Sequence, residues 1–205
     1  MRLSVSILNS IDKINMIKTL NNSKISYIHI DVMDGLFVSQ KSLPSDEIIK
    51  LSPFSSKPLD IHLMVEDPMY YIEKIKELPN IDNITIHLEI NKDIKNILNK
   101  IKEYDFKRSL AIKPNTDINL LIPYLDTIDR ILIMTVEPGL GGQPFLENRI
   151  KEIKKLIKDK NIELEVDGGI NNQTINKVKD VDISVVGSYI TTSDNPVQRI
   201  NDLLV

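Results

Sequence analysis

Two stretches of this chain, IHIDVMDG at residues 28–35 and LDIHLMVEDP at residues 59–68, guide the interpretation of the rest. Each begins as a short apolar strand and carries a histidine. Successive side chains on a strand point to opposite faces, so His29 and Asp31 share one face. The first stretch therefore predicts an imidazole and a carboxylate side by side on one wall, near the end of a strand.

Similar β-branched runs recur along the chain and alternate with amphipathic segments. Two of these segments, 91–104 and 147–158, place Ile and Leu at the i, i+3, i+4, i+7 spacing of a helix. Eight strands that alternate with helices predict a parallel sheet and an α/β fold. We expect one domain over residues 1–205, a closed (β/α)8 TIM barrel in which a helix follows each strand, with a doubly wound open sheet as the main alternative. The expected strands are 3–8, 25–31, 58–65, 83–88, 108–113, 130–136, 162–167 and 182–187.

Composition excludes several classes of protein. The 205 residues are 41% hydrophobic and 27% charged, with a formal net charge of −3, so the sequence has no electrostatic signature of a nucleic-acid or membrane-surface partner. No apolar run reaches the roughly 18 residues of a membrane span, and the N-terminal residues lack the apolar region of a signal peptide. The absence of cysteine excludes disulfides and thiolate ligands and agrees with a cytoplasmic protein.

Four side chains form a candidate metal site. His62 ends the apolar strand of the second stretch, and Asp167 ends a strand in LEVDGGINNQT at 164–174. Because active sites in this barrel lie at the carboxyl ends of the strands, we expect these residues to meet His29 and Asp31. Two buried carboxylates without a cation would be costly. The set predicts one divalent metal ion, with zinc first and iron, manganese or cobalt as alternatives, and it also supplies two acid/base groups.

Glycines cluster after the last three expected strands and suggest a phosphate-binding region. Each cluster could be only a turn, but glycine also lets backbone N–H groups approach an anion closely, and this barrel often binds phosphate after its last strands. We therefore expect a phosphorylated small-molecule substrate. The residues concerned are Gly139, Gly141, Gly142, Gly168, Gly169, Gly187 and the adjacent Ser188.

Two further polar residues point toward the same face as the candidate site. His87 has no nearby aspartate, and we favour a structural, hydrogen-bonded role for it. Asp60 shares the strand parity of His62, so it could orient His62 from behind. A plain buried hydrogen bond is an equal alternative for Asp60.

Met33, Met64 and Met134 occupy inward positions at strand ends. They fill the core or line a substrate pocket, and the residues alone favour neither interpretation. Lys113 ends the fifth expected strand and could form a Schiff base, which would make the protein a lysine-dependent aldolase. Because Pro114 follows directly, we favour a loop lysine.

Taken together, these motifs resemble those of the ribulose-phosphate 3-epimerase family. The resemblance covers nearly the whole chain, with the motifs in the order and spacing of the family. They are SILNS (6–10), HIDVMDG (29–35), DIHLMVEDP (60–68), TIHLE (85–89), AIKPNT (111–116), MTVEPGLGGQPF (134–145), VDGGIN (166–171) and VVGS (185–188).

The resemblance implies a (β/α)8 barrel of the ribulose-phosphate-binding type that interconverts D-ribulose 5-phosphate and D-xylulose 5-phosphate in the pentose phosphate pathway. It implies that Asp31 and Asp167 are the acid/base pair on either face of a cis-enediolate. By the same resemblance, the metal ligands are His29, Asp31, His62 and Asp167. The substrate and phosphate contacts are Ser6, His62, Gly139, Leu140, Gly141, Gly142, Gly168, Gly169, Gly187 and Ser188, and the methionines around the reacting carbons are Met33, Met64 and Met134.

Two loops depart from the family pattern. Ser39-Gln40-Lys41 stands after Phe37-Val38, where the family usually has Pro-Asn, and Asn115 stands where it usually has Gly. These changes affect loop conformation, substrate fit and subunit contacts more than the chemistry. The alternatives are an allulose-6-phosphate 3-epimerase, which shares most of the signature, and a non-catalytic sugar-phosphate-binding barrel. The resemblance also implies a homo-oligomer, either a dimer or a hexamer.

Overall fold

All eight expected strands form in the computed structural model, which describes residues 1–138 and 147–204. They pair in parallel in the order β1-β9-β8-β7-β6-β5-β4-β2, and β1 also pairs with β2, so the sheet closes on itself. This closure confirms the (β/α)8 TIM barrel and excludes the open sheet. The strands are β1 (Arg2–Ser6), β2 (Tyr27–Asp34), β4 (Leu59–Met64), β5 (Ile81–His87), β6 (Lys107–Ile112), β7 (Arg130–Met134), β8 (Glu163–Asp167) and β9 (Ile183–Val186).

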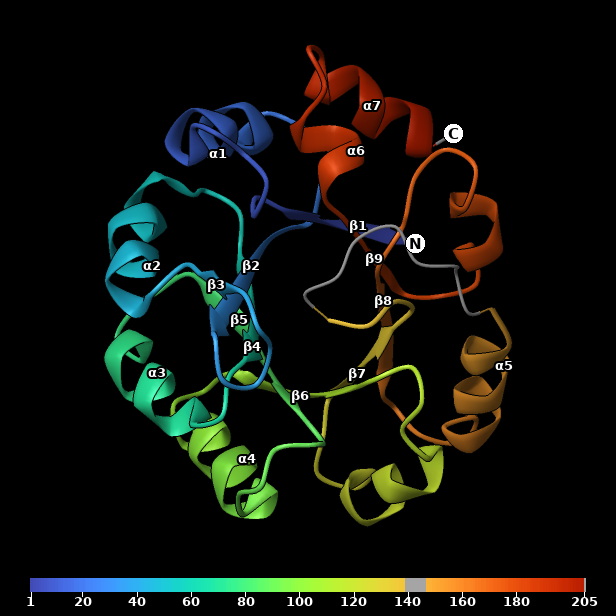
Figure 1. The fold of residues 1–205 in the computed structure, drawn as a ribbon. Helices are drawn as coiled ribbons and strands as arrows, with labels where there is room; N and C mark the ends of the chain where they lie inside the picture. Colours follow the sequence, from blue (N-terminus) through green and yellow to red (C-terminus); the bar gives the residue numbers. More distant parts are fainter. Residues whose placement is uncertain (139–146, 205) are drawn as a thin grey trace.

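Helices surround the barrel as an outer ring (Figure 1). In the two segments with clear apolar periodicity, the prediction is confirmed by α4 and α5. Asp93 caps α4, because its side chain accepts a hydrogen bond from the Asn96 backbone N–H at 3.1 Å. The helices are α1 (Lys13–Asn21), α2 (Ser45–Leu51), α3 (Pro68–Ile75), α4 (Ile94–Glu103), α5 (Glu147–Leu156), α6 (Ser188–Thr191) and α7 (Pro196–Leu203), with a short 3₁₀ turn η1 (Ser52–Phe54) after α2.

The prediction of a helix after every strand is wrong at two connections, where the structure has only 3₁₀ helices. A 3₁₀ helix, η2 (Ile118–Tyr124), follows β6, and another, η3 (Ile175–Val178), follows β8. Pro123 lies inside η2, where it cannot donate the backbone hydrogen bond that an α-helix would need. After β8, the Asn171 side chain accepts hydrogen bonds from the backbone N–H groups of Gln173 and Thr174, which closes a turn before η3 begins.

The strands divide their side chains between two environments. On β2, Ile28, Ile30 and Val32 are buried in the large apolar cluster between the barrel and the helices. His29 and Asp31 alternate with them and therefore face the barrel interior. The outward apolar residues hold the helices, and the inward positions are left for polar side chains.

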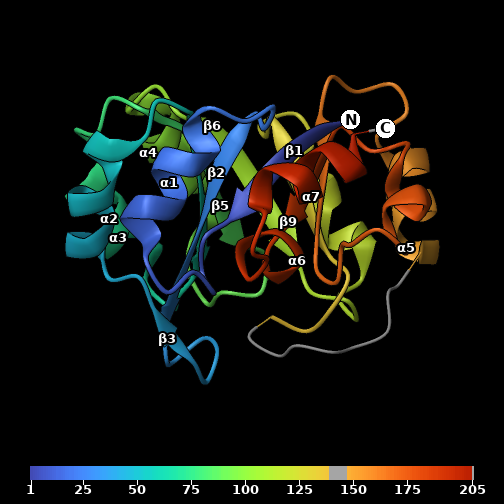
Figure 2. The ribbon, with the colours of Figure 1, turned by 90° about the horizontal axis from the view of Figure 1, so that it is seen from above.

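The β2 strand continues into a short hairpin that sequence patterns did not predict. The antiparallel β3 (Lys41–Ser42) pairs with the end of β2. The turn includes Gly35 with φ of +79°, and a Cβ atom there would lie 2.6 Å from the Lys41 side chain. The hairpin projects from the end of the barrel opposite to the N-terminus (Figure 2).

In the part of the chain that the structure describes, no helix is both long and apolar enough to cross a membrane.

Candidate active site

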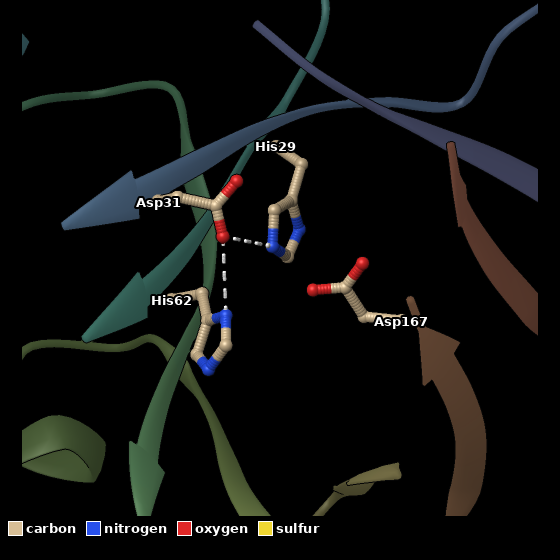
Figure 3. Close-up of side chains that lie close together, drawn as sticks. All are labelled: His29, Asp31, His62 and Asp167. Atoms are coloured by element: carbon tan, nitrogen blue, oxygen red, sulfur yellow. Dashed lines mark hydrogen bonds and ion pairs between the residues drawn. The ribbon is translucent and has the colours of Figure 1, made fainter. Parts of the chain in front are cut away.

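The carboxyl ends of β2, β4 and β8 bring the four predicted metal ligands together (Figure 3). Parallel pairing of β2 with β4 sets Asp31 directly opposite His62. Asp167, at the end of β8, faces them from across the barrel. One nitrogen or oxygen atom from each of His29, Asp31, His62 and Asp167 lies within 4.8 Å of all the others. The group therefore has the donor types and spacing to surround one cation.

Asp31 lies at the centre of this group. Its Oδ1 atom lies 3.3 Å from His29 Nε2 and 3.3 Å from His62 Nδ1. The Ser6 hydroxyl on β1 donates a hydrogen bond to the other carboxylate oxygen at 2.5 Å. Both histidines are fully buried, and His29 Nε2 forms no hydrogen bond. A buried ring nitrogen without a hydrogen-bond partner, aimed at two carboxylates, is suited to a metal ligand.

The electrostatics of the site shift the pKa values of the two aspartates in opposite directions. Burial raises the pKa of Asp31, but His29 and His62 outweigh burial and hold that pKa well below its usual range. Burial and the charge of Asp31 act in the same direction on Asp167 and raise its pKa to about 6. Burial lowers the pKa of His29, yet Asp31 and Asp60 outweigh it and raise that pKa well above the usual value. The site thus carries an excess of negative charge that attracts protons or cations.

Asp60 contacts His29 and not His62, so of the two equal interpretations of the sequence the structure favours the plain buried hydrogen bond. The Nδ1 atom of His29 lies 2.8 Å from Asp60 Oδ2. The pairing of β2 with β4 places Asp60 directly opposite His29, whereas His62 is opposite Asp31. Shared parity gave the correct face, but the strand register decided the partner. Since the carboxylate can only accept, Nδ1 of His29 carries a proton and Nε2 is the nitrogen that faces the site.

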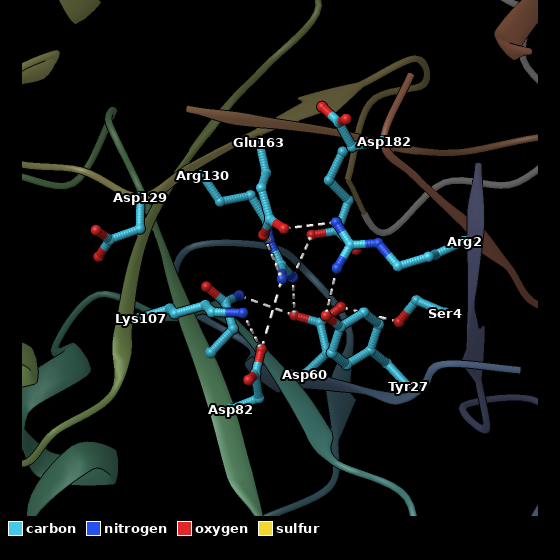
Figure 4. A network of polar contacts seen from close by, with 12 residues as sticks. Arg2, Ser4, Tyr27, Asp60, Asp82, Lys107, Asp129, Arg130, Glu163 and Asp182 are labelled. Carbon is cyan, nitrogen blue, oxygen red and sulfur yellow. Dashed lines mark hydrogen bonds and ion pairs between the residues drawn. The ribbon is translucent and has the colours of Figure 1, made fainter. Parts of the chain in front are cut away.

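Below the four ligands lies a buried layer of charged and amide side chains that sequence reasoning missed (Figure 4). Arg130 is fully buried, and its guanidinium lies 3.2 Å from Asp60, 3.0 Å from Glu163 and 3.1 Å from Glu165. Burial and the charge of Asp60 raise the pKa of Glu165 to about 8, so Glu165 is mainly neutral at pH 7. The sequence held a signal, because Glu163, Glu165 and Asp167 alternate along one strand and so share a face.

His87 and Glu89 extend the site on the β5 side. His87 is fully buried, and its Nε2 atom lies 2.9 Å from Nε2 of His62. Its Nδ1 atom lies 3.1 Å from Glu89 Oε2. Burial lowers the pKa of His87 to about 4, which keeps the ring neutral at pH 7. His87 is hydrogen-bonded, as the structural interpretation of the sequence expected, but its partner is one of the candidate ligands.

A pocket of about 470 Å³ opens above the candidate ligands. Asp31 and Asp167 line it, whereas the fully buried His29 and His62 are not among its lining residues. Lys113 is not among its lining residues, and its ammonium lies 4.0 Å from the centre of the Phe37 ring. The other predicted site residues that line the pocket are Ser6, Met33, Met64, Met134, Gly168, Gly169, Gly187 and Ser188.

The backbone after β8 requires glycine at the edge of the pocket. Gly168 has φ of +118° and Gly169 has φ of +65°. A Cβ atom at Gly168 would lie 2.7 Å from the Thr135 hydroxyl oxygen. The predicted phosphate contacts Gly139, Leu140, Gly141 and Gly142 lie outside the described residues.

Comparison with known proteins points to one family. The sequence matches the ribulose-phosphate 3 epimerase family over residues 2–191. It is 32% identical over 197 residues to a ribulose-phosphate 3-epimerase from Bacillus subtilis (strain 168), covering 92% of this chain and 90% of the relative. It is 34% identical over 211 aligned residues to one from Helicobacter pylori (strain J99), covering 99% of this chain and 96% of the relative.

Solved structures share the fold at low sequence identity. A KGPDC from Streptococcus mutans superposes with a TM-score of 0.72 at 18% identity, covering 99% of this chain and 95% of that one. This likeness supports the barrel architecture and carries no information about the reaction.

Proposed function

The chain belongs to the ribulose-phosphate 3-epimerase family and is an epimerase, and from that premise we propose that it interconverts D-ribulose 5-phosphate and D-xylulose 5-phosphate with Asp31 and Asp167 as the acid/base pair. The observation that supports this most strongly is the approach of the two carboxylates from opposite sides of one pocket. Such a reaction belongs to the pentose phosphate pathway.

Inversion at C3 of a 2-ketose requires a proton to leave one face and a proton to arrive on the other. The adjacent ketone makes this proton removable, because the charge delocalises as an enediolate. One aspartate removes the proton while the other donates, and their roles exchange when the direction of reaction reverses. The pKa of Asp31 is lowered and that of Asp167 is raised, which supports different protonation behaviour for the two carboxylates of the pair.

We assign one divalent ion, with zinc first, to His29, Asp31, His62 and Asp167. When bound, such an ion would stabilise negative charge on the substrate oxygens as a Lewis acid. The residues fit it, because His29 Nε2 is buried without a hydrogen bond and the surrounding charge is negative. The deeper group of His29, Asp60 and Glu165 also has suitable atoms, but Arg130 already supplies a cation there.

The remaining pocket residues hold the substrate in this proposal. Ser6 holds Asp31 in place by a hydrogen bond, and Met33, Met64 and Met134 supply apolar walls beside the reacting carbons. The phosphate group would lie near the backbone of Gly168, Gly169, Gly187 and Ser188, together with 139–142. A homo-oligomer, either a dimer or a hexamer, completes the proposal, and analytical ultracentrifugation measures it.

The test is exchange of the C3 proton of ribulose 5-phosphate in heavy water, followed by NMR. Asp31→Asn and Asp167→Asn should each lower turnover by roughly 10²–10⁴-fold while circular dichroism shows a folded barrel. Asp180→Asn, which changes an exposed carboxylate, serves as the matched control. Near-normal turnover in both site variants would exclude the two-aspartate scheme. Faster exchange with allulose 6-phosphate would favour the hexulose phosphate as substrate.

A further inference from the structure

The two ring nitrogens of His62 face different partners. Its Nδ1 atom lies 3.3 Å from Asp31 Oδ1, and its Nε2 atom lies 2.9 Å from Nε2 of His87. The planes of the His62 and His87 rings are inclined by 27°, with centroids 5.0 Å apart. Two nitrogens at hydrogen-bond distance share one hydrogen, so one ring donates and the other accepts. The direction of this bond decides which nitrogen of His62 is protonated.

Glu89 sets that direction. Its Oε2 atom lies 3.1 Å from His87 Nδ1, and its Oε1 atom accepts hydrogen bonds from the Lys113 backbone N–H at 2.7 Å and from the Thr116 hydroxyl. A carboxylate can only accept, so Nδ1 of His87 carries the hydrogen and Nε2 accepts. His62 therefore donates from Nε2, and its Nδ1 atom keeps a lone pair directed at the site.

We propose that His87 and Glu89 are positioning residues, which fix the tautomer of His62 so that its Nδ1 atom stays free to bind a cation. The inference rests on the metal site of the proposed function. Asp31 would favour the opposite tautomer, because an N–H at Nδ1 could donate to its carboxylate at 3.3 Å. The contact with His87 is the shorter of the two, and the Glu89 carboxylate holds it in one direction.

A carboxylate thus supports each of the two histidines of the site, directly in one case and through a second histidine in the other. Asp60 contacts His29 directly, whereas Glu89 reaches His62 through the intervening ring of His87. Both supports fix a proton on the nitrogen that faces away from the site. Carboxylate support of this kind orients a ligand and makes it more basic.

Glu89→Gln tests the proposal without a change of shape. The backbone N–H of Lys113 and the hydroxyl of Thr116 both donate to Oε1, so the amide oxygen of glutamine should occupy that position. Its NH₂ group then faces His87 Nδ1 and donates to it. The hydrogen of His87 moves to Nε2, and His62 must carry its own hydrogen on Nδ1.

Two measurements report this change. Nitrogen-15 NMR of the metal-free protein in mildly alkaline buffer should show His62 with its hydrogen on Nε2 in the native chain and on Nδ1 in Glu89→Gln. Zinc affinity, measured by competition with a chromophoric chelator, should fall by roughly 10–100-fold in the variant. Glu103→Gln, which removes an exposed carboxylate that pairs with Lys100, should leave both unchanged.

A second variant tests the proposal independently, in case Glu89→Gln fails to fold. His87→Phe keeps an aromatic ring beside His62 but removes the acceptor, so His62 should again move its hydrogen toward Asp31. The proposal is overturned if His62 carries its hydrogen on Nδ1 in the native chain, or if Glu89→Gln keeps the native tautomer and zinc affinity. If the native chain binds no zinc while its His62 tautomer is as expected, the metal assignment of the proposed function fails instead.

Discussion

Asp167→Asn should make the metal-free protein more stable at neutral pH, although it removes a proposed catalytic group. Burial and the charge of Asp31 raise the pKa of Asp167 from 3.8 to about 6. A rise of that size corresponds to about 3 kcal/mol by which the fold disfavours the ionised carboxylate. Because Asp167 is partly exposed in the pocket, solvent screens some of this, and we expect a gain of about 1–3 kcal/mol.

The pH dependence of this gain identifies its cause. The native protein holds the Asp167 proton more tightly than the unfolded chain does, so this contribution to stability is complete below pH 3.8 and is lost as the pH rises through about 6. The asparagine variant has no such loss. The two proteins should therefore be almost equally stable near the lower pH, and the variant should be more stable above the higher one.

Urea unfolding of chelator-treated protein, followed by circular dichroism at several pH values, measures the difference. Asp180→Asn, which changes an exposed carboxylate, is the control. Added zinc should reverse the order, because only the native chain keeps all four ligands and a bound ligand stabilises the folded state. Equal or lower stability of metal-free Asp167→Asn at pH 7 would refute the reasoning about charge in this site.

Two further predictions concern the deeper layer and the backbone after β8. Arg130→Met removes the guanidinium that pairs with the buried Asp60 and Glu165 side chains, and it should cost about 3–5 kcal/mol of unfolding free energy in urea. A loss below about 1 kcal/mol would show that the layer is not held by charge. Gly168→Ala should be more destabilising in thermal unfolding than Gly169→Ala, because its Cβ atom would meet Thr135 whereas the space at Gly169 is open. Equal melting temperatures would contradict this steric argument.

Much of the fold follows from local patterns in the sequence. The β-branched runs locate all eight barrel strands, and apolar periodicity locates α4 and α5. The hairpin strand β3 has only two residues and no pattern of its own, so it could not be recognised. Pro123, in contrast, is a sequence signal that the segment after β6 does not form a regular α-helix.

The candidate site was predictable as a set of inward-facing residues, but its contacts were not. Strand parity places His29, Asp31 and His62 on the inner face. It does not supply the register, which pairs Asp60 with His29 rather than with His62. Nor can parity show that Arg130, on β7, reaches across the interior to Asp60, on β4. Such contacts depend on closure of the whole barrel, which no single stretch of sequence encodes.

The alternation of side chains along β4 and β5 also limits which insertions and deletions this barrel can accept during evolution. Deleting one residue within either strand would rotate every later side chain by half a turn and exchange His62 or His87 for a neighbouring aliphatic residue. Length changes are therefore confined to the connecting loops, or must occur two residues at a time within a strand. Insertions and deletions in this protein should therefore accumulate in the loops at the two ends of the barrel, while the strands keep their lengths.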